Sequence, residues 1–163
     1  MSMQNSAAAL VLSLIAVAAS AQAIRTEKNM SLDLANQIAG ATVAACTANG
    51  YAVTATVVDR AGTVRAVQRA DNAGPHTVGA AQQKAFTSAS AKNNTLAMME
   101  GAQKNPAAAN LVYIPGFLLV GGGVPIKAGN EVIGAVGVGG APGGHLDEQC
   151  AVAGIDKAKE LLK

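Results

Sequence analysis

The chain has 163 residues, of which half are hydrophobic and only 13% are charged, and its formal net charge is +2. This length is enough for one domain with a buried core. The small charge, with no run of Lys or Arg and no basic stripe between aromatic residues, argues against a nucleic-acid-binding protein.

The first 23 residues have the pattern of a secretory signal peptide. The apolar run from Ala7 to Ala19 has the length of an h-region, and Ala21-Gln22-Ala23 is an A-x-A cleavage site. The segment departs from the pattern because no Lys or Arg precedes the apolar run. The alternative is an uncleaved membrane anchor, although the run is short for a span of about 20 residues. We expect cleavage after Ala23, which leaves residues 24–163 as a single periplasmic or secreted domain without a membrane segment.

The first half of this domain predicts a helix followed by a hairpin. The helix is expected to start at Ser31, a favourable N-cap, and to end at Asn49-Gly50, where Gly50 suits a left-handed conformation. The stretch 51–59 alternates and is rich in β-branched residues. A tight turn at 59–62 and a second strand at 63–70 follow it. The short connection predicts an antiparallel pair.

The second half predicts two helices, a β-meander and a last helix. The helices are expected at His76–Lys92 and at residues 94–105, after which Pro106 breaks the pattern and residues 107–116 look irregular. Three short apolar runs at 117–120, 124–129 and 130–140 predict three strands. Residues 145–163 predict an amphipathic helix. The order favours an α+β fold with a mostly antiparallel sheet and helices packed on it.

The only two cysteines, Cys46 and Cys150, both lie in the mature part. In an oxidising compartment they are expected to form one disulfide that closes a long loop. Two buried free thiols are the alternative. The chain has no C-x-x-C and no Cys/His spacing typical of a metal site.

The glycine-rich stretch 121–150 does not match a phosphate-binding loop. Neither G-x-G-x-x-G nor G-x-x-x-x-G-K-[ST] occurs in it. The stretch leads into a helix start that could hold an anion, but Asp147 and Glu148 complement the helix dipole there and would repel a phosphate. We expect its glycines to allow strands and helices to approach closely.

Few residues carry a catalytic pattern, and the chain has no G-x-S-x-G. His76 and His145 each follow a Gly/Pro loop near a helix start, where a histidine can act as a base or a metal ligand or remain a solvated polar residue. Asp59 and Asp71 flank the hairpin. Turn formation by Asp59, and helix-end electrostatics for Asp147 and Glu148, explain these carboxylates better than acid–base catalysis does.

Several segments taken together resemble the GlcG/HbpS-like proteins, also called the haem-degrading or DUF336 family. These segments are VVDRAGTVRAVQRADNAGPHT, QKAFTSAS, GGGVPI and EVIGAVGVGGAPGGHLDEQCAVAGI. They come in the order typical of the family and extend the resemblance over residues 31–162. The matching residues, most of which we interpret as architectural, are Asp59, Gly62, Arg69, Asp71, Lys84, Gly122, Gly123, Pro125, Gly134, Gly137, Asp147 and Glu148.

The resemblance implies a profilin-like fold. It implies a five-stranded antiparallel sheet, with N- and C-terminal helices, helices on one face and a helical insertion between strands 2 and 3. It also implies homo-oligomers built from dimers, up to octamers. The activities that it implies are haem binding and, in some members, iron binding and slow haem breakdown. No shared catalytic machinery is established in the family, so no catalytic residue is carried over and enzymatic activity is left open.

Candidate haem ligands follow from side-chain chemistry. His76 is the first candidate for the axial ligand of the haem iron, because it lies at a loop-to-helix junction beside the R-x-D segment; His145 and Tyr113 follow. Arg69 and Lys84 are expected to pair with the haem propionates. The low aromatic content, 2%, counts against a tight pocket, because cofactor sites are usually lined by large apolar side chains.

Three functional hypotheses result. The first is an extracytoplasmic haem-binding protein in haem or iron handling or redox sensing. The second is an enzyme or accessory protein for a small hydroxy acid of a glycolate-type pathway, with Arg69 and Lys84 binding the carboxylate. The third is a structural module that binds a partner such as an extracytoplasmic sensor domain.

Overall fold

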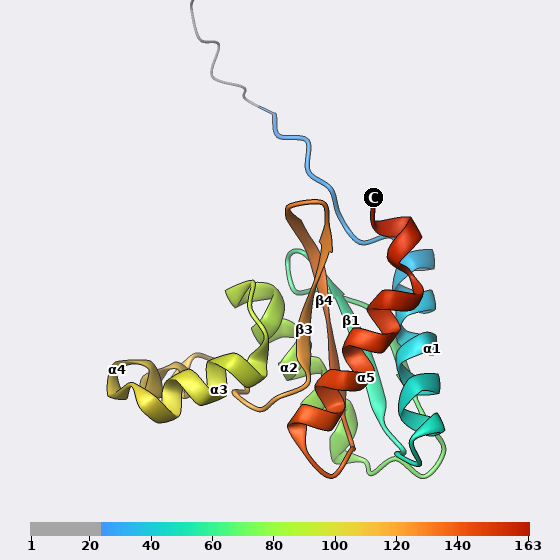
Figure 1. The fold of residues 1–163 in the computed structure, drawn as a ribbon. Coiled ribbons are helices and arrows are strands. Elements are labelled where there is room, and N and C mark those ends of the chain that lie inside the picture. The colour runs from blue at the N-terminus through green and yellow to red at the C-terminus, as the bar shows by residue number, and fades with distance from the viewer. Residues whose placement is uncertain (1–23) are drawn as a thin grey trace, which may run out of the picture.

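The computed structural model describes residues 24–163, and the expected signal peptide lies outside the described residues (Figure 1). No helix within residues 24–163 is both long and apolar enough to cross a membrane. The elements in chain order are α1 (Leu32–Ala48), β1 (Thr54–Asp59), β2 (Val64–Arg69), α2 (His76–Ala91), α3 (Thr95–Lys104), α4 (Pro106–Ala109), η1 (Asn110–Tyr113), β3 (Gly123–Ala128), β4 (Glu131–Gly139), α5 (Gly144–Lys157) and η2 (Lys159–Leu162).

The strands form one antiparallel sheet in the order β2-β1-β4-β3. The predicted hairpin of β1 and β2 is confirmed, with Thr54 opposite Arg69. Its turn is stabilised by Asp59, whose Oδ1 accepts hydrogen bonds from the backbone N–H groups of Ala61 and Thr63, both at 3.0 Å. The turn-forming interpretation of Asp59 therefore agrees with the structure.

The prediction of a fifth strand at residues 117–120 is wrong. Within residues 24–163 the sheet has four strands, and this segment runs beside it as a loop. The backbone N–H of Leu118 donates to Oγ1 of Thr87 at 2.8 Å, and the carbonyl of Val120 accepts from Oγ1 of Thr95 at 2.7 Å. These helix side chains satisfy polar groups that a strand would direct to a neighbouring strand.

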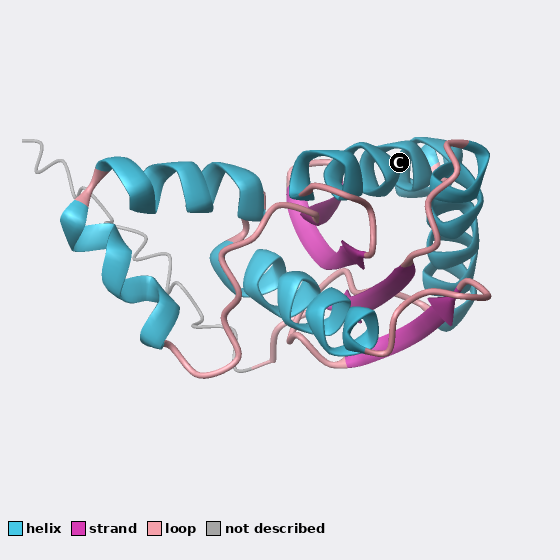
Figure 2. Cartoon of the chain, turned by 90° about the horizontal axis from the view of Figure 1, so that it is seen from below, coloured by secondary structure: helices cyan, strands magenta, loops and turns pink. Residues whose placement is uncertain are grey.

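Helices cover both faces of the sheet, whereas the resemblance implied helices on one face. On one face α1 and α5 pack against the apolar side chains of all four strands, and α2 packs on the opposite face of β1, β3 and β4 (Figure 2). Every residue of β1 is consequently buried. The helix pair forms the larger core, which includes Ile38, Val57, Ile126, Val136 and Val138.

Glycine permits the close approach of α2 to the sheet. A Cβ placed on Gly137 of β4 would lie 2.0 Å from the carbonyl oxygen of Ala81 and 2.4 Å from the backbone nitrogen of Ala85. No side chain larger than hydrogen fits there without moving the helix. The glycines of β4 therefore serve close packing, as the sequence indicated.

A disulfide joins the two helices of the larger core. Cys46 in α1 and Cys150 in α5 are bonded, with their Cα atoms 5.3 Å apart and 104 positions apart in the sequence. Both residues are buried. The bond therefore links the first and last long helices of the domain.

A helical insertion extends from the body between β2 and β3 (Figures 1 and 2). We call residues 95–116, which comprise α3, α4, η1 and the following turn, the arm. The predicted helix after Asn94 is present, and part of the stretch expected to be irregular forms α4 and η1. Thr95 and Met98 are the only buried residues of the arm. The rest of the domain therefore covers little of the arm's surface.

Replacing both cysteines by alanine should lower the free energy of unfolding. A cross-link that closes a loop of this length stabilises the folded state by about 4–5 kcal/mol in the chain-entropy model. We expect the C46A/C150A variant to unfold at a lower urea concentration than the oxidised protein. Equal midpoints for the two proteins would contradict this role of the disulfide.

Candidate functional site

A buried ion pair connects α2 to the start of α5. Nζ of Lys84 lies 2.8 Å from Oδ2 of Asp147 and donates a second hydrogen bond, also of 2.8 Å, to the carbonyl of Val138 at the end of β4. Each of the two charged residues is only 3% exposed. Oδ1 of Asp147 accepts from the backbone N–H of Ala141 at 3.0 Å. Both carboxylate oxygens are thus engaged within the fold.

The strand entry at Gly121–Gly123 closes over this pair. Gly122 has φ +119°, and a Cβ there would lie 2.7 Å from Cβ of Asp147 and 2.7 Å from the carbonyl oxygen of Val138. Its conformation and its surroundings both require glycine. The two glycines that open the motif G-G-x-P-I therefore pack against Lys84 and Asp147.

The pKa of Asp147 is raised above its ordinary value because burial disfavours the carboxylate. The hydrogen bond and positive charge of Lys84, and the N–H of Ala141, act in the opposite direction. The expected propionate contact of Lys84 would require its ammonium group to leave this carboxylate. The pair therefore holds α2, β4 and α5 together. Asp147 lies in the first turn of α5, the position for which the sequence suggested an interaction with the helix dipole.

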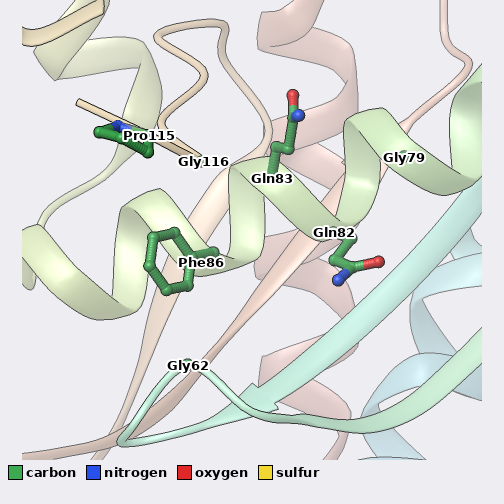
Figure 3. Close-up of a pocket in the computed structure, with 7 residues that line it drawn as sticks. All are labelled: Gly62, Gly79, Gln82, Gln83, Phe86, Pro115 and Gly116. Atoms are coloured by element: carbon green, nitrogen blue, oxygen red, sulfur yellow. The ribbon is translucent and has the colours of Figure 1, made fainter. Parts of the chain in front are cut away.

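A hollow of about 360 Å³ lies along the outer side of α2. Phe86 forms its floor, between Gly62 of the β1–β2 turn and Pro115–Gly116 at the end of the arm (Figure 3). Gly79, Gln82 and Gln83 continue the lining along the helix. The ring of Phe86 also meets Phe117 edge to face, with the ring centroids 6.2 Å apart. The lining is aromatic and polar but carries no charge.

His76 and Arg69 lie at the two ends of the loop that leads into α2. His76 is the first residue of α2 and is exposed, and its ring folds back over Gly74. Arg69, at the end of β2, donates from its guanidinium group to the carbonyl of Ala73. The structure thus brings a histidine and a cation to one end of the helix that carries the hollow.

His145 lines a second hollow, of about 430 Å³, on α5. Leu96, Val152 and Ala153 supply its apolar part, and Glu148 and Asp156 add two acidic groups. Oε1 of Glu148 accepts from Nδ2 of Asn94 at 2.9 Å, whereas its Oε2 is buried without a hydrogen-bond partner among the described residues. This hollow is therefore acidic.

The remaining candidate, Tyr113, lies in η1 of the arm and is 81% exposed. Asp71 borders a third hollow, between the end of α1 and the end of β2. Within residues 24–163, no three His, Cys, Asp or Glu side chains come together in a way that could hold a metal ion. The three candidate iron ligands thus lie in three separate regions: His76 at the start of α2, His145 in α5 and Tyr113 in the arm.

Sequence reasoning missed the hollow on α2. Gly62, Phe86 and Gly116 are far apart in the chain, and only the fold brings them together. The sequence carried one signal, since Gly62 belongs to the D-x-x-G turn and Gly116 follows Pro115. In the structure these two glycines have φ +81° and +84°. A Cβ on Gly62 would lie 2.7 Å from the ring of Phe86.

Comparison with known proteins identifies the family. A family model described as "Haem degrading protein HbpS-like" matches residues 30–156. The "Crystal Structure of HbpS" superposes with a TM-score of 0.77 at 38% sequence identity, covering 89% of this chain and 99% of that chain. A Streptomyces reticuli HbpS double mutant gives a TM-score of 0.77 at 36% identity, covering 93% of this chain and 98% of that chain. The chain belongs to the HbpS-like family.

Two more distant structures share the fold. The Klebsiella pneumoniae protein ORFY, of family DUF336, has a TM-score of 0.77 at 29% identity, covering 82% of this chain and 93% of that chain. A structure described as a PduOC:Heme complex has a TM-score of 0.70 at 22% identity, covering 78% of this chain and 94% of that chain. The search of curated proteins finds no match.

Removing the positive partner of the buried pair should destabilise the fold. The K84M variant leaves the carboxylate of Asp147 buried without its cation, which typically costs about 3–5 kcal/mol. The K84M/D147N double variant removes both charges and keeps an acceptor for the N–H of Ala141. We expect urea unfolding to show a smaller loss for the double variant than for K84M. If K84M unfolds like the unmodified protein, the pair has no such role.

Proposed function

We propose that this protein is an extracytoplasmic haem-binding protein that acts in haem or iron handling or in redox sensing. The observation that carries the proposal is the match of residues 30–156 to the HbpS-like family model, whose description names haem degradation. A structural relative described with bound haem adds support. The signal-peptide pattern of residues 1–23, together with a disulfide of the kind that persists in oxidising compartments, supports the location.

The described residues fit haem at the surface of the domain. His76, His145 and Tyr113 are exposed and offer groups that ligate iron. Arg69 uses its guanidinium group for one backbone carbonyl and has further N–H donors for a propionate. The hollow of α2 offers an aromatic floor. Bound haem would supply a redox-active iron, and these side chains would hold and orient it.

The hydroxy-acid hypothesis has weaker support. It requires Arg69 and Lys84 to bind one carboxylate, but Lys84 is buried and already bonded to Asp147. Arg69 is exposed and remains suited to a carboxylate.

The partner-binding hypothesis is favoured by the arm. No charged side chain occurs from Asn105 to Ile126, yet Val112, Tyr113 and Ile114 are exposed there. We propose that a second copy of this chain covers this patch, because two uncharged surfaces meet without like-charge repulsion. The same patch is the candidate contact for an extracytoplasmic sensor domain if self-association leaves it free.

A hemin titration tests haem binding. We expect near-stoichiometric loading of the purified mature protein, with a shift of the Soret band as the iron acquires a protein ligand. Changing His76 and His145 together to alanine should abolish that shift. The absence of a shift in the unmodified protein would contradict haem binding, and a shift unaffected by the double change would contradict histidine ligation.

A charge placed on the arm should weaken self-association. In V112E a carboxylate would be buried at the proposed contact without a partner, which is costly. Light scattering coupled to size exclusion should show a lower mass for V112E than for the unmodified protein. L161E is the matched control, since Leu161 is 57% exposed, Val112 is 52% exposed and Leu161 lies far along the chain in η2. An unchanged mass for V112E, or an equal loss in L161E, would contradict this contact.

A further inference from the structure

The arm carries an apolar groove that is open to solvent. The groove has a volume of about 230 Å³, and its lining comes from α3, from α4 and η1, and from the segment that leads to β3. The lining residues are Met99, Ala102, Gln103, Ala109, Val112 and Leu119. None of them is charged, and Gln103 is the only one with a polar side chain. We call this hollow the arm groove.

Tyr113 is the one aromatic side chain in the described part of the chain that is not packed. The sequence has two tyrosines and two phenylalanines. Phe86 and Phe117 meet edge to face, and Tyr51 packs against the larger core. In contrast, Tyr113 is 81% exposed, and Ile114 after it is 41% exposed. Tyrosine is enriched at protein interfaces because it combines a large apolar ring with a polar hydroxyl, so Tyr113 is suited to a contact with another molecule.

Tyr113 does not fill the groove of its own arm. It follows Val112 in the 3-10 helix η1. Three residues complete one turn of such a helix, so neighbouring side chains point about 120° apart. Val112 lines the arm groove, whereas Tyr113 is not among the lining residues. An aromatic side chain that enters the groove therefore comes from another molecule.

A second copy of this chain suits the groove because the groove and the exposed tyrosine adjoin on one arm. In a two-fold contact, a residue of one copy meets a different residue of the other, and the reciprocal contact forms as well. One such contact would place each Tyr113 in the other copy's groove and cover both features. Charge does not oppose it, because no charged side chain occurs from Asn105 to Ile126 or in the groove lining. The charged residues of α3, Glu100 and Lys104, have opposite signs and do not line the groove.

We infer that two copies pair through their arms about a two-fold axis, with Tyr113 of each copy inserted in the arm groove of the other. The ring would pack on Met99, whose flexible thioether adapts to an aromatic ring. The carboxamide of Gln103 would form a hydrogen bond with the tyrosine hydroxyl, which needs a partner when the ring is buried. This inference rests on the self-association proposed above and adds the surface that the arm meets on the second copy.

Thiol cross-linking between two variants tests this contact. A102C places a thiol in the groove, and Y113C replaces the inserted side chain by a second thiol. The two variants are mixed, one of them with an affinity tag, and treated with a bismaleimide about as long as a tyrosine side chain. The native cysteines are buried and bonded to each other, so they do not react. We expect a mixed dimer of intermediate mass on a denaturing gel.

L161C is the matched control for Y113C. Leu161 is 57% exposed and lies in η2, outside the arm. A mixture of A102C and L161C should give no mixed dimer above the level of random collision. A product of equal yield in the two mixtures would overturn the insertion of Tyr113 in the groove.

The dissociation constant of self-association gives a second measurement. We expect Y113A to weaken association by about tenfold or more, as truncation of a tyrosine anchor commonly does. Y113F should weaken it less, because the ring is retained and only the hydroxyl is lost. If Y113A associates as tightly as the unmodified protein while V112E weakens association, the groove assignment is wrong and the arm contact stands. If V112E leaves association unchanged, the proposed arm contact itself fails. The hemin titration measures haem binding independently of both.

Discussion

The buried ion pair of Lys84 and Asp147 is the constraint on which the arrangement of this domain depends. It joins α2 on one face of the sheet to the start of α5 on the other. Lys84 also donates a hydrogen bond to the carbonyl of Val138 near the end of β4. Gly122 closes over it where no other residue fits. Since an unpaired charge at this depth is costly, the two helices and the strand entry are held in one relative position.

That position decides which side of α2 faces solvent. Lys84, Ala81 and Ala85 direct one side of the helix into the sheet, where Gly137 allows backbone contact. His76, Gly79 and Phe86 are consequently turned outward. Residues packed against the sheet thus fix which face of α2 carries His76 and the hollow on Phe86.

Sequence reasoning succeeded where local signals and structure agree. Ser31 caps α1 through a hydrogen bond from the N–H of Leu34, and Gly50 ends that helix region with φ +79°. The apolar run at 117–120 was misread as a strand because its pattern does not reveal that Thr87 and Thr95 would take its backbone hydrogen bonds. Lys84 was expected at a haem propionate because a cation pairs well with a carboxylate; only the fold shows its actual carboxylate partner, Asp147, 63 positions away. The hollow on α2 likewise combines three distant segments.

Hydrogen exchange measured with and without hemin tests the central proposal, that this domain binds haem with His76 as the first candidate ligand, most directly. Exchange reports local protection along the chain, so it distinguishes the candidate regions without a substitution. The account predicts slower amide exchange in peptides covering residues 74–88 and 114–118, and unchanged exchange in those covering α5. Protection confined to residues 144–157, around His145, would contradict it.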